Sequence, residues 1–89
     1  MAVLMTSEVE GQSPQGYEGM LAVLSDPLRQ APGFVLHASH PVDGGWRIVE
    51  VWNSREDAAR FFAAHVAPKL PDGIRPKLSF QPLHDVLIP

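Results

Sequence analysis

The strongest hydrophobic pattern in the chain is a pair of apolar runs on either side of Asp43-Gly44. Both runs lie within residues 33–54 and are rich in Val, Ile, Phe and Trp, which favour strands. An Asp-Gly pair tolerates the positive φ that a two-residue turn needs. We therefore expect a β-hairpin in which Val42 and Gly45 close the turn.

Antiparallel pairing through that turn sets His37 opposite Glu50 and Val35 opposite Trp52. A turn at Gly44-Gly45 would change these partners but not the faces, because strand side chains alternate with period two. One face carries His37, Trp46, Ile48, Glu50 and Trp52, and the other carries Leu36, Ala38, Val49 and Val51. Because both faces are apolar, we expect both to be covered.

A strand and a helix are predicted before the hairpin. Residues 2–10 begin with an apolar run and then alternate, which is typical of a strand. Ser13 is a good N-cap and Pro14 suits the first helical position. Apolar residues at helical spacing then extend the predicted helix to about Ser25, where Pro27 breaks or kinks it.

A second helix and a last strand are predicted after the hairpin. Ser54 caps the helix, and Pro68 and residues 70–73 end it. One face of this helix carries Ala58, Phe61, Phe62 and His65. A strand is expected over residues 77–88, and Pro82, which has no amide donor, indicates an edge position or a bulge.

The resulting order, β-α-β-β-α-β, predicts an α+β protein with the ferredoxin-like fold, in one domain that spans residues 1–89. Its four-stranded antiparallel sheet would carry two helices on one face. Two helices leave the other apolar face uncovered, so we expect the chain to form a homodimer through the sheet.

Composition excludes several classes of protein. The chain has 89 residues, 45% of them hydrophobic and 19% charged, which is typical of a globular domain. Its net charge is −3 and the Lys and Arg residues are scattered, so no nucleic-acid partner is expected. The absence of Cys excludes thiol nucleophiles and disulfides. No signal peptide and no membrane-spanning segment is predicted, which favours a cytoplasmic protein without a membrane partner.

Three segments resemble the antibiotic-biosynthesis-monooxygenase-like group of dimeric α/β barrels: SPQGYE, the stretch GFVLHASHPVDGGWRIVEVWNSREDAARFFAAHVAPKL, and LHDVLIP. The resemblance implies an obligate dimer whose sheets face each other, with a small pocket between sheet and helices in each subunit. Members include cofactor-independent oxygenases of polyketide quinones, haem-degrading enzymes and polyketide cyclases. The oxygen-handling branches use an Asn from the first strand, which here reads AVLMTSEV, and this departure argues against quinone-forming or haem-degrading chemistry.

His37 and Glu50 are the candidate catalytic residues. A carboxylate beside an imidazole fixes the tautomer of the ring and raises its basicity, as a general base needs near neutral pH. The alternative is a structural cross-strand ion pair. No metal is expected, because His37 and His40 point to opposite faces of a strand and no His-x-x-x-His pair exists. No glycine-rich nucleotide motif is present either, so no cofactor is expected.

Four residues are candidates for substrate binding. Trp52 matches the position at which the resembling group places an aromatic beside its pocket, although a Trp before a helix cap also suits an ordinary core. Phe61 and His65 share the helix face that points to the sheet, and Ile48 shares the sheet face of His37. Large inward side chains, among them Tyr17, would instead favour a pocket that the protein fills itself.

Three functions remain open. The first is a cofactor-independent enzyme, monooxygenase-like or cyclase/isomerase-like, that acts on a flat hydrophobic metabolite such as a polyketide in secondary metabolism. The second is a protein that binds such a small molecule without catalysis. The third is a purely structural dimer. Fold resemblance does not choose among them.

Overall fold

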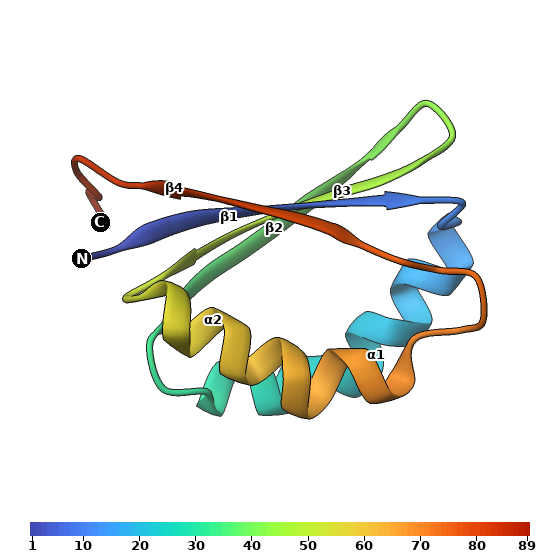
Figure 1. Cartoon of the computed structure of the whole chain (residues 1–89), viewed down its shortest axis with the longest axis horizontal. Helices are drawn as coiled ribbons and strands as arrows, with labels where there is room; N and C mark the ends of the chain where they lie inside the picture. Colours follow the sequence, from blue (N-terminus) through green and yellow to red (C-terminus); the bar gives the residue numbers. More distant parts are fainter.

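The computed structural model describes residues 1–89 as a four-stranded antiparallel sheet with both helices on one face (Figure 1). The elements are β1 (Val3–Glu10), α1 (Pro14–Gln30), β2 (Phe34–Val42), β3 (Gly45–Trp52), α2 (Arg55–Phe61) and β4 (Lys77–Pro82). The strand order is β2-β3-β1-β4. The predicted ferredoxin-like α+β fold is therefore confirmed.

The hairpin forms with the expected turn. Val42 pairs with Gly45, and His37 pairs with Glu50. Of the two turn residues only Gly44 has a positive φ, 76°, so the turn does not adopt the type I′ conformation, which needs positive φ at both positions. The side chains of β3 lie on the predicted faces of the sheet, because their alternation with period two holds along the strand.

The predicted pairing of Val35 with Trp52 is wrong. The register shifts between Phe34 and Leu36, and Phe34 is the residue opposite Trp52. A β-bulge places two residues of one strand against one residue of its partner, so Val35 has no partner on β3. Sequence periodicity alone does not reveal such an insertion.

Helix α1 continues five residues beyond the predicted end at Ser25 and contains Pro27 in its last turns. A proline inside a helix costs about 3 kcal/mol, since it removes a hydrogen bond and crowds the preceding turn. Leu28, one residue later, is only 5% exposed and belongs to the hydrophobic core. Burying a leucine contributes about 1.5–3 kcal/mol, so the packing of Leu28 largely offsets the cost of Pro27.

The helical segment before residues 70–73 and the strand after them also differ in detail from the prediction. After α2 the chain continues as a π-helical turn (Phe62–Val66) and a 3-10 turn (Ala67–Lys69), so the helical segment ends close to the predicted place. The predicted strand 77–88 is too long, because β4 ends at Pro82. Pro82 has no N–H to continue the ladder. β4 is an edge strand, as that proline indicates.

The main core lies between the sheet and the helices. Its buried members are Val3, Met5, Leu28, Trp52, Ala58 and Phe61. Both helices start at the predicted caps, where the hydroxyl of Ser13 accepts from the N–H of Gly16 and that of Ser54 accepts from the N–H of Asp57. No helix of the chain has the length and apolar character needed to cross a membrane.

The opposite face of the sheet has no helix over it (Figure 1). Leu36 on this face is 39% exposed, and Ala38 is also exposed. Val49 is half-buried and Val51 is buried. The chain therefore carries an apolar strip of sheet that its own helices leave open.

Candidate functional site

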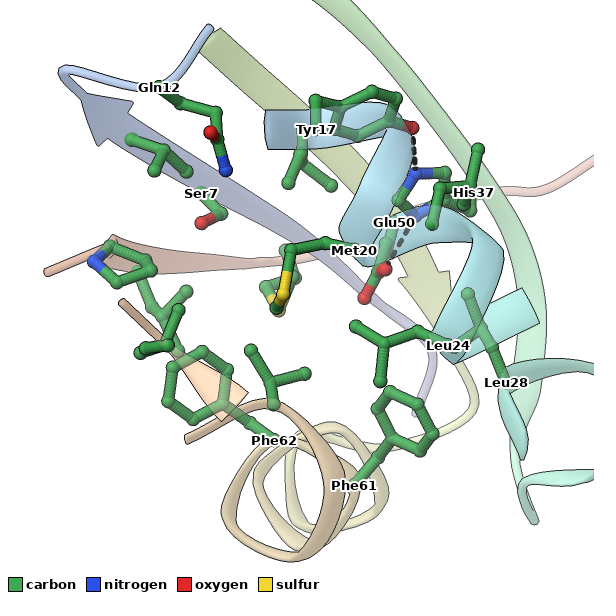
Figure 2. Close-up of a pocket in the computed structure, with 18 residues that line it drawn as sticks. Ser7, Gln12, Tyr17, Met20, Leu24, Leu28, His37, Glu50, Phe61 and Phe62 are labelled. Carbon is green, nitrogen blue, oxygen red and sulfur yellow. Dashed lines mark hydrogen bonds and ion pairs between the residues drawn. The ribbon is translucent and has the colours of Figure 1, made fainter. Parts of the chain in front are cut away.

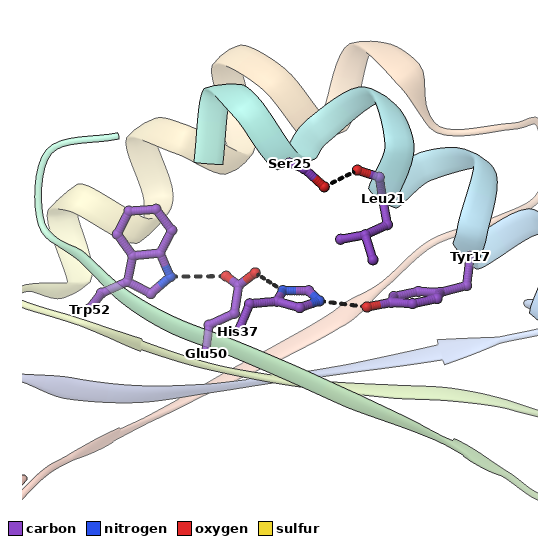
Figure 3. A network of polar contacts seen from close by, with 6 residues as sticks. All are labelled: Tyr17, Leu21, Ser25, His37, Glu50 and Trp52. Carbon is purple, nitrogen blue, oxygen red and sulfur yellow. Dashed lines mark hydrogen bonds and ion pairs between the residues drawn. The ribbon is translucent and has the colours of Figure 1, made fainter. Parts of the chain in front are cut away.

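A continuous chain of hydrogen bonds crosses the helix-facing side of the sheet (Figure 3). The hydroxyl of Tyr17 lies 2.7 Å from Nε2 of His37, and Nδ1 of His37 lies 2.7 Å from Oε2 of Glu50. The indole Nε1–H of Trp52 donates to Oε1 of Glu50 over 2.9 Å. Strands β2 and β3 hold the two central residues in one cross-strand pair, and α1 supplies the tyrosine.

The chemical character of Trp52 and Glu50 fixes where the protons of this chain lie. The indole of Trp52 can only donate, and an ionised Glu50 can only accept. Nδ1 of His37 therefore carries a proton and donates it to Glu50, which leaves Nε2 of the neutral ring as an acceptor for the hydroxyl of Tyr17. This is the tautomer that a carboxylate-oriented histidine base requires.

Burial raises the pKa of Tyr17 above its ordinary value, and the negative charges of Glu18 and Glu50 raise it further. A hydrogen bond with Ser39 lowers this pKa and opposes part of the effect. Tyr17 is therefore neutral at physiological pH and has a proton to donate. Its ring stacks on that of Trp46, with 4.9 Å between the ring centroids, which holds the hydroxyl in place.

A cavity of about 80 Å³ lies between the helices and this face of the sheet (Figure 2). Most of its wall is apolar, and its polar lining consists of Ser7, Gln12, Tyr17, His37 and Glu50. The volume exceeds the roughly 10–15 Å³ that one water needs, but it is below the roughly 150 Å³ of a cavity that binds benzene. A ring-sized ligand would therefore require the wall to move. Met20, which has three rotatable side-chain bonds, is part of that wall.

Four of the six candidate site residues border this cavity: His37, Glu50, Ile48 and Phe61. The prediction that Trp52 borders it is wrong, since Trp52 is 0% exposed and lies in the core, where it orients Glu50 from behind. It packs edge-on to Phe34, with 5.5 Å between the ring centroids.

The prediction that His65 reaches over the cavity is also wrong. Its ring stacks on Phe61 with 4.9 Å between the ring centroids, and it lines a shallow surface groove next to Pro27 instead. The chain between Phe61 and His65 enters the π-helical turn, where residues per turn exceed the α-helical number. The helical wheel placed His65 between Phe61 and Phe62; its contact with Phe61 forms, but its ring does not reach the cavity.

Three polar residues of the cavity were absent from the predicted site. Tyr17 was predicted as an inward side chain that fills the pocket and not as a partner of His37, because which residue of α1 lies over His37 depends on how the helix packs on the sheet. Ser7 had a signal in the sequence: it is the one polar residue among the inward positions of β1, between Met5 and Val9. Gln12 lies in the β1–α1 connection and had no such signal. No three His, Cys, Asp or Glu side chains meet in the manner of a metal site.

The fold of this chain has counterparts among solved structures. No family model matches the sequence, and no curated protein does. SnoaB, a cofactor-independent oxygenase from Streptomyces nogalater, superposes with a TM-score of 0.69 at 17% identity, over 97% of this chain and 96% of SnoaB. The chain has the fold of this oxygenase.

A second solved protein shares the same fold. MhuD, a haem degrader from Mycobacterium tuberculosis solved with two haems in its active site, superposes with a TM-score of 0.59 at 19% identity, over 98% of this chain and 99% of MhuD. An MhuD variant with manganese protoporphyrin IX bound gives a TM-score of 0.68. Both solved structures agree with the fold that the sequence resemblance implies.

Proposed function

We propose that this protein is a small cofactor-independent enzyme that removes a proton from a flat hydrophobic metabolite. The observation that supports this most is the Tyr17–His37–Glu50 hydrogen-bond chain at the wall of an apolar cavity. A buried polar chain of this kind is costly to maintain unless every member is satisfied, as these are. The likeness to SnoaB in fold agrees with chemistry that needs no cofactor.

The chain of hydrogen bonds provides a route for one proton. A weakly acidic group of the substrate gives its proton to the oxygen of Tyr17 while Tyr17 passes its own proton to Nε2 of His37. The resulting imidazolium is stabilised by Glu50, whose carboxylate stays ionised and already holds Nδ1. The substrate anion then cyclises, isomerises or reacts with dioxygen, which takes its electrons from the substrate. The proton held on His37 returns to the product through Tyr17. Because β2 holds His37 and the stack on Trp46 holds Tyr17, little reorganisation accompanies the transfer.

The apolar wall supports a flat, mainly hydrophobic substrate, for which a polyketide of secondary metabolism is the model. Haem does not suit this cavity. Both ring nitrogens of His37 are engaged, by Tyr17 and Glu50, and the volume of about 80 Å³ is far smaller than a porphyrin requires. The same small volume is the observation that favours the alternative of a structural protein without a ligand.

The open face of the sheet supports a homodimer as the working form, and the cytoplasm is the compartment that we propose for it. Exposed Leu36 and Ala38 lie there beside half-buried Val49, and nothing in the chain covers them. Face-to-face packing of two sheets would remove this strip from water, and a stable dimer needs about 800 Å² buried on each subunit.

The catalytic proposal is tested with 4-hydroxyacetophenone, a flat phenol whose phenolate absorbs at longer wavelength than the phenol. We expect the bound phenol to be more ionised than the free phenol at the same pH, because its proton moves to the Tyr17–His37 relay. Tyr17→Phe keeps the ring that stacks on Trp46 but removes the hydroxyl, so the bound probe should remain neutral. Binding without any change in ionisation would refute the relay, and no binding at all would favour the structural alternative.

The dimer is tested by sedimentation. The wild-type chain should sediment as a dimer at micromolar concentration, and Leu36→Asp or Val49→Asp should give a monomer, since each places an unpaired charge in the covered face. Val23→Asp is the matched control, because Val23 is 51% exposed on α1, away from the sheet. A wild-type monomer, or Asp variants that remain dimeric, would refute this interface.

A further inference from the structure

The cavity has a second polar group of residues that the proton relay does not use. Ser7 projects into the cavity from β1 and is only 4% exposed, and Gln12 enters from the connection between β1 and α1. The hydroxyl of Ser7 has no side-chain or backbone partner among the hydrogen bonds of the chain. The amide nitrogen of Gln12 points inward, toward Ser7 (Figure 2). Two donors therefore meet at one side of an otherwise apolar wall.

Gln12 is held in this orientation from two sides. Its Oε1 accepts a hydrogen bond from the backbone N–H of Ser13 over 3.2 Å, so the oxygen faces the backbone and the NH₂ group faces inward. The side chain also lies over Gly16, where a Cβ would come within 2.2 Å of Oε1. Gly16 does not have a positive φ, so the backbone does not require glycine at this position. Glycine matters here because the absence of a Cβ leaves space for the side chain of Gln12.

We propose that Ser7 and Gln12 form a second subsite that receives a neutral hydrogen-bond acceptor of the ligand, a carbonyl or ether oxygen, with Gly16 as the residue that positions Gln12. This inference rests on the proposed function, since it concerns a ligand in the same cavity. Both groups offer an N–H or O–H to such an oxygen. A buried donor that finds no partner in the ligand is costly, which makes the subsite a determinant of specificity.

The two polar groups lie on opposite sides of β3. Ser7 is on β1, whereas the hydroxyl of Tyr17 bonds His37 on β2, so a ligand that reaches both groups crosses β3. Neighbouring strands lie about 4.8 Å apart, so this separation is on the scale of one substituted aromatic ring. The proton relay would hold the acidic hydroxyl, and Ser7 with Gln12 would hold the acceptor at the far end.

Two matched probes test the subsite: 4-hydroxyacetophenone, which has a carbonyl opposite its hydroxyl, and 4-isopropylphenol, which replaces the carbonyl with an apolar group. Titration calorimetry should show that the wild-type protein binds the first about tenfold more tightly than the second. Ser7→Ala and Gln12→Leu should each remove most of this preference and leave the affinity for 4-isopropylphenol nearly unchanged. Gln15→Leu is the control, because Gln15 is an exposed glutamine of α1 outside the cavity.

Gly16→Ala tests the positioning role separately. Alanine is compatible with the helix, so the fold should persist, while the new Cβ displaces Gln12. We expect the preference for 4-hydroxyacetophenone to fall, and the side-chain NH₂ resonances of Gln12 to stop responding to that probe in ¹⁵N-correlated NMR spectra. Equal affinity of the wild-type protein for both probes would overturn the subsite and leave the proton relay standing. Failure of both probes to bind would overturn the proposed ligand site and the subsite with it.

Discussion

Replacing Glu50 tests whether the buried hydrogen-bond chain is built around a charge. Glu50 accepts from two donors, the indole of Trp52 and Nδ1 of His37, and its side chain is only 10% exposed. Glu50→Leu removes both acceptors and keeps most of the volume. Glu50→Gln keeps the shape and one acceptor oxygen, so the two variants separate the loss of hydrogen bonds from the loss of packing.

The size of the effect follows from the two donors. The indole N–H of Trp52 is completely buried, and an unsatisfied buried donor costs about 1–3 kcal/mol. His37 is less affected, because its side chain is 16% exposed and its ring can take the other tautomer. Removal of the buried charge returns part of its desolvation cost. Because the small loss at His37 and this gain roughly cancel, we expect Glu50→Leu to lower the free energy of unfolding by about 1–3 kcal/mol.

Glu50→Gln should cost only about 1 kcal/mol, because the amide can accept from Trp52 and donate to Nδ1 of His37. This substitution reverses only the hydrogen bond between residue 50 and His37, so Nε2 of His37 would carry the proton and could no longer accept one from Tyr17. The variant should therefore be nearly as stable as the wild-type protein yet fail to ionise bound 4-hydroxyacetophenone. The assay is urea unfolding, followed by Trp fluorescence at one fixed protein concentration since a dimer's stability depends on concentration. A Glu50→Leu variant as stable as the wild type would show that the carboxylate is not needed to satisfy Trp52.

Three further predictions concern the pKa of Tyr17, the backbone and the caps. Tyr17 is the only tyrosine, so tyrosinate absorbance reports its pKa directly. The titration midpoint should lie above 10.0 in the folded protein and return to about 10 in urea, because burial raises the pKa. Equal midpoints in the two states would contradict the burial argument. Because the folded pKa is the higher one, the stability that neutral Tyr17 contributes should be complete below pH 10 and decline as the pH rises through the folded pKa. Gly33→Ala should lower the stability measured by urea unfolding more than Gly44→Ala does. Both glycines have positive φ, but only at Gly33 would a Cβ collide with the carboxylate of Asp57. Equal losses of stability would refute this steric explanation. Ser54→Ala should cost about 1 kcal/mol by the same measurement, and no loss would show that its cap on α2 is dispensable.

The pairing of His37 with Glu50 could be predicted from the sequence because every step in it is local. The Asp43-Gly44 turn sets the register of the hairpin, and the period of two along a strand then decides which side chains share a face. The starts of both helices were predictable for the same reason, since a serine hydroxyl caps the N–H groups of the next turn.

Tertiary packing decided the rest of the site. Tyr17 lies 20 residues before His37, and only the docking of α1 on the sheet brings its hydroxyl to Nε2. The continuation of α1 past Pro27 depends on the burial of Leu28 in the core, a contact that local propensity does not contain. His65 leaves the cavity because the helical period changes after Phe61. Turns, caps and alternation act between near neighbours in the chain, whereas the angle and depth of a helix on a sheet depend on the shapes of all the side chains between them, which no local pattern specifies.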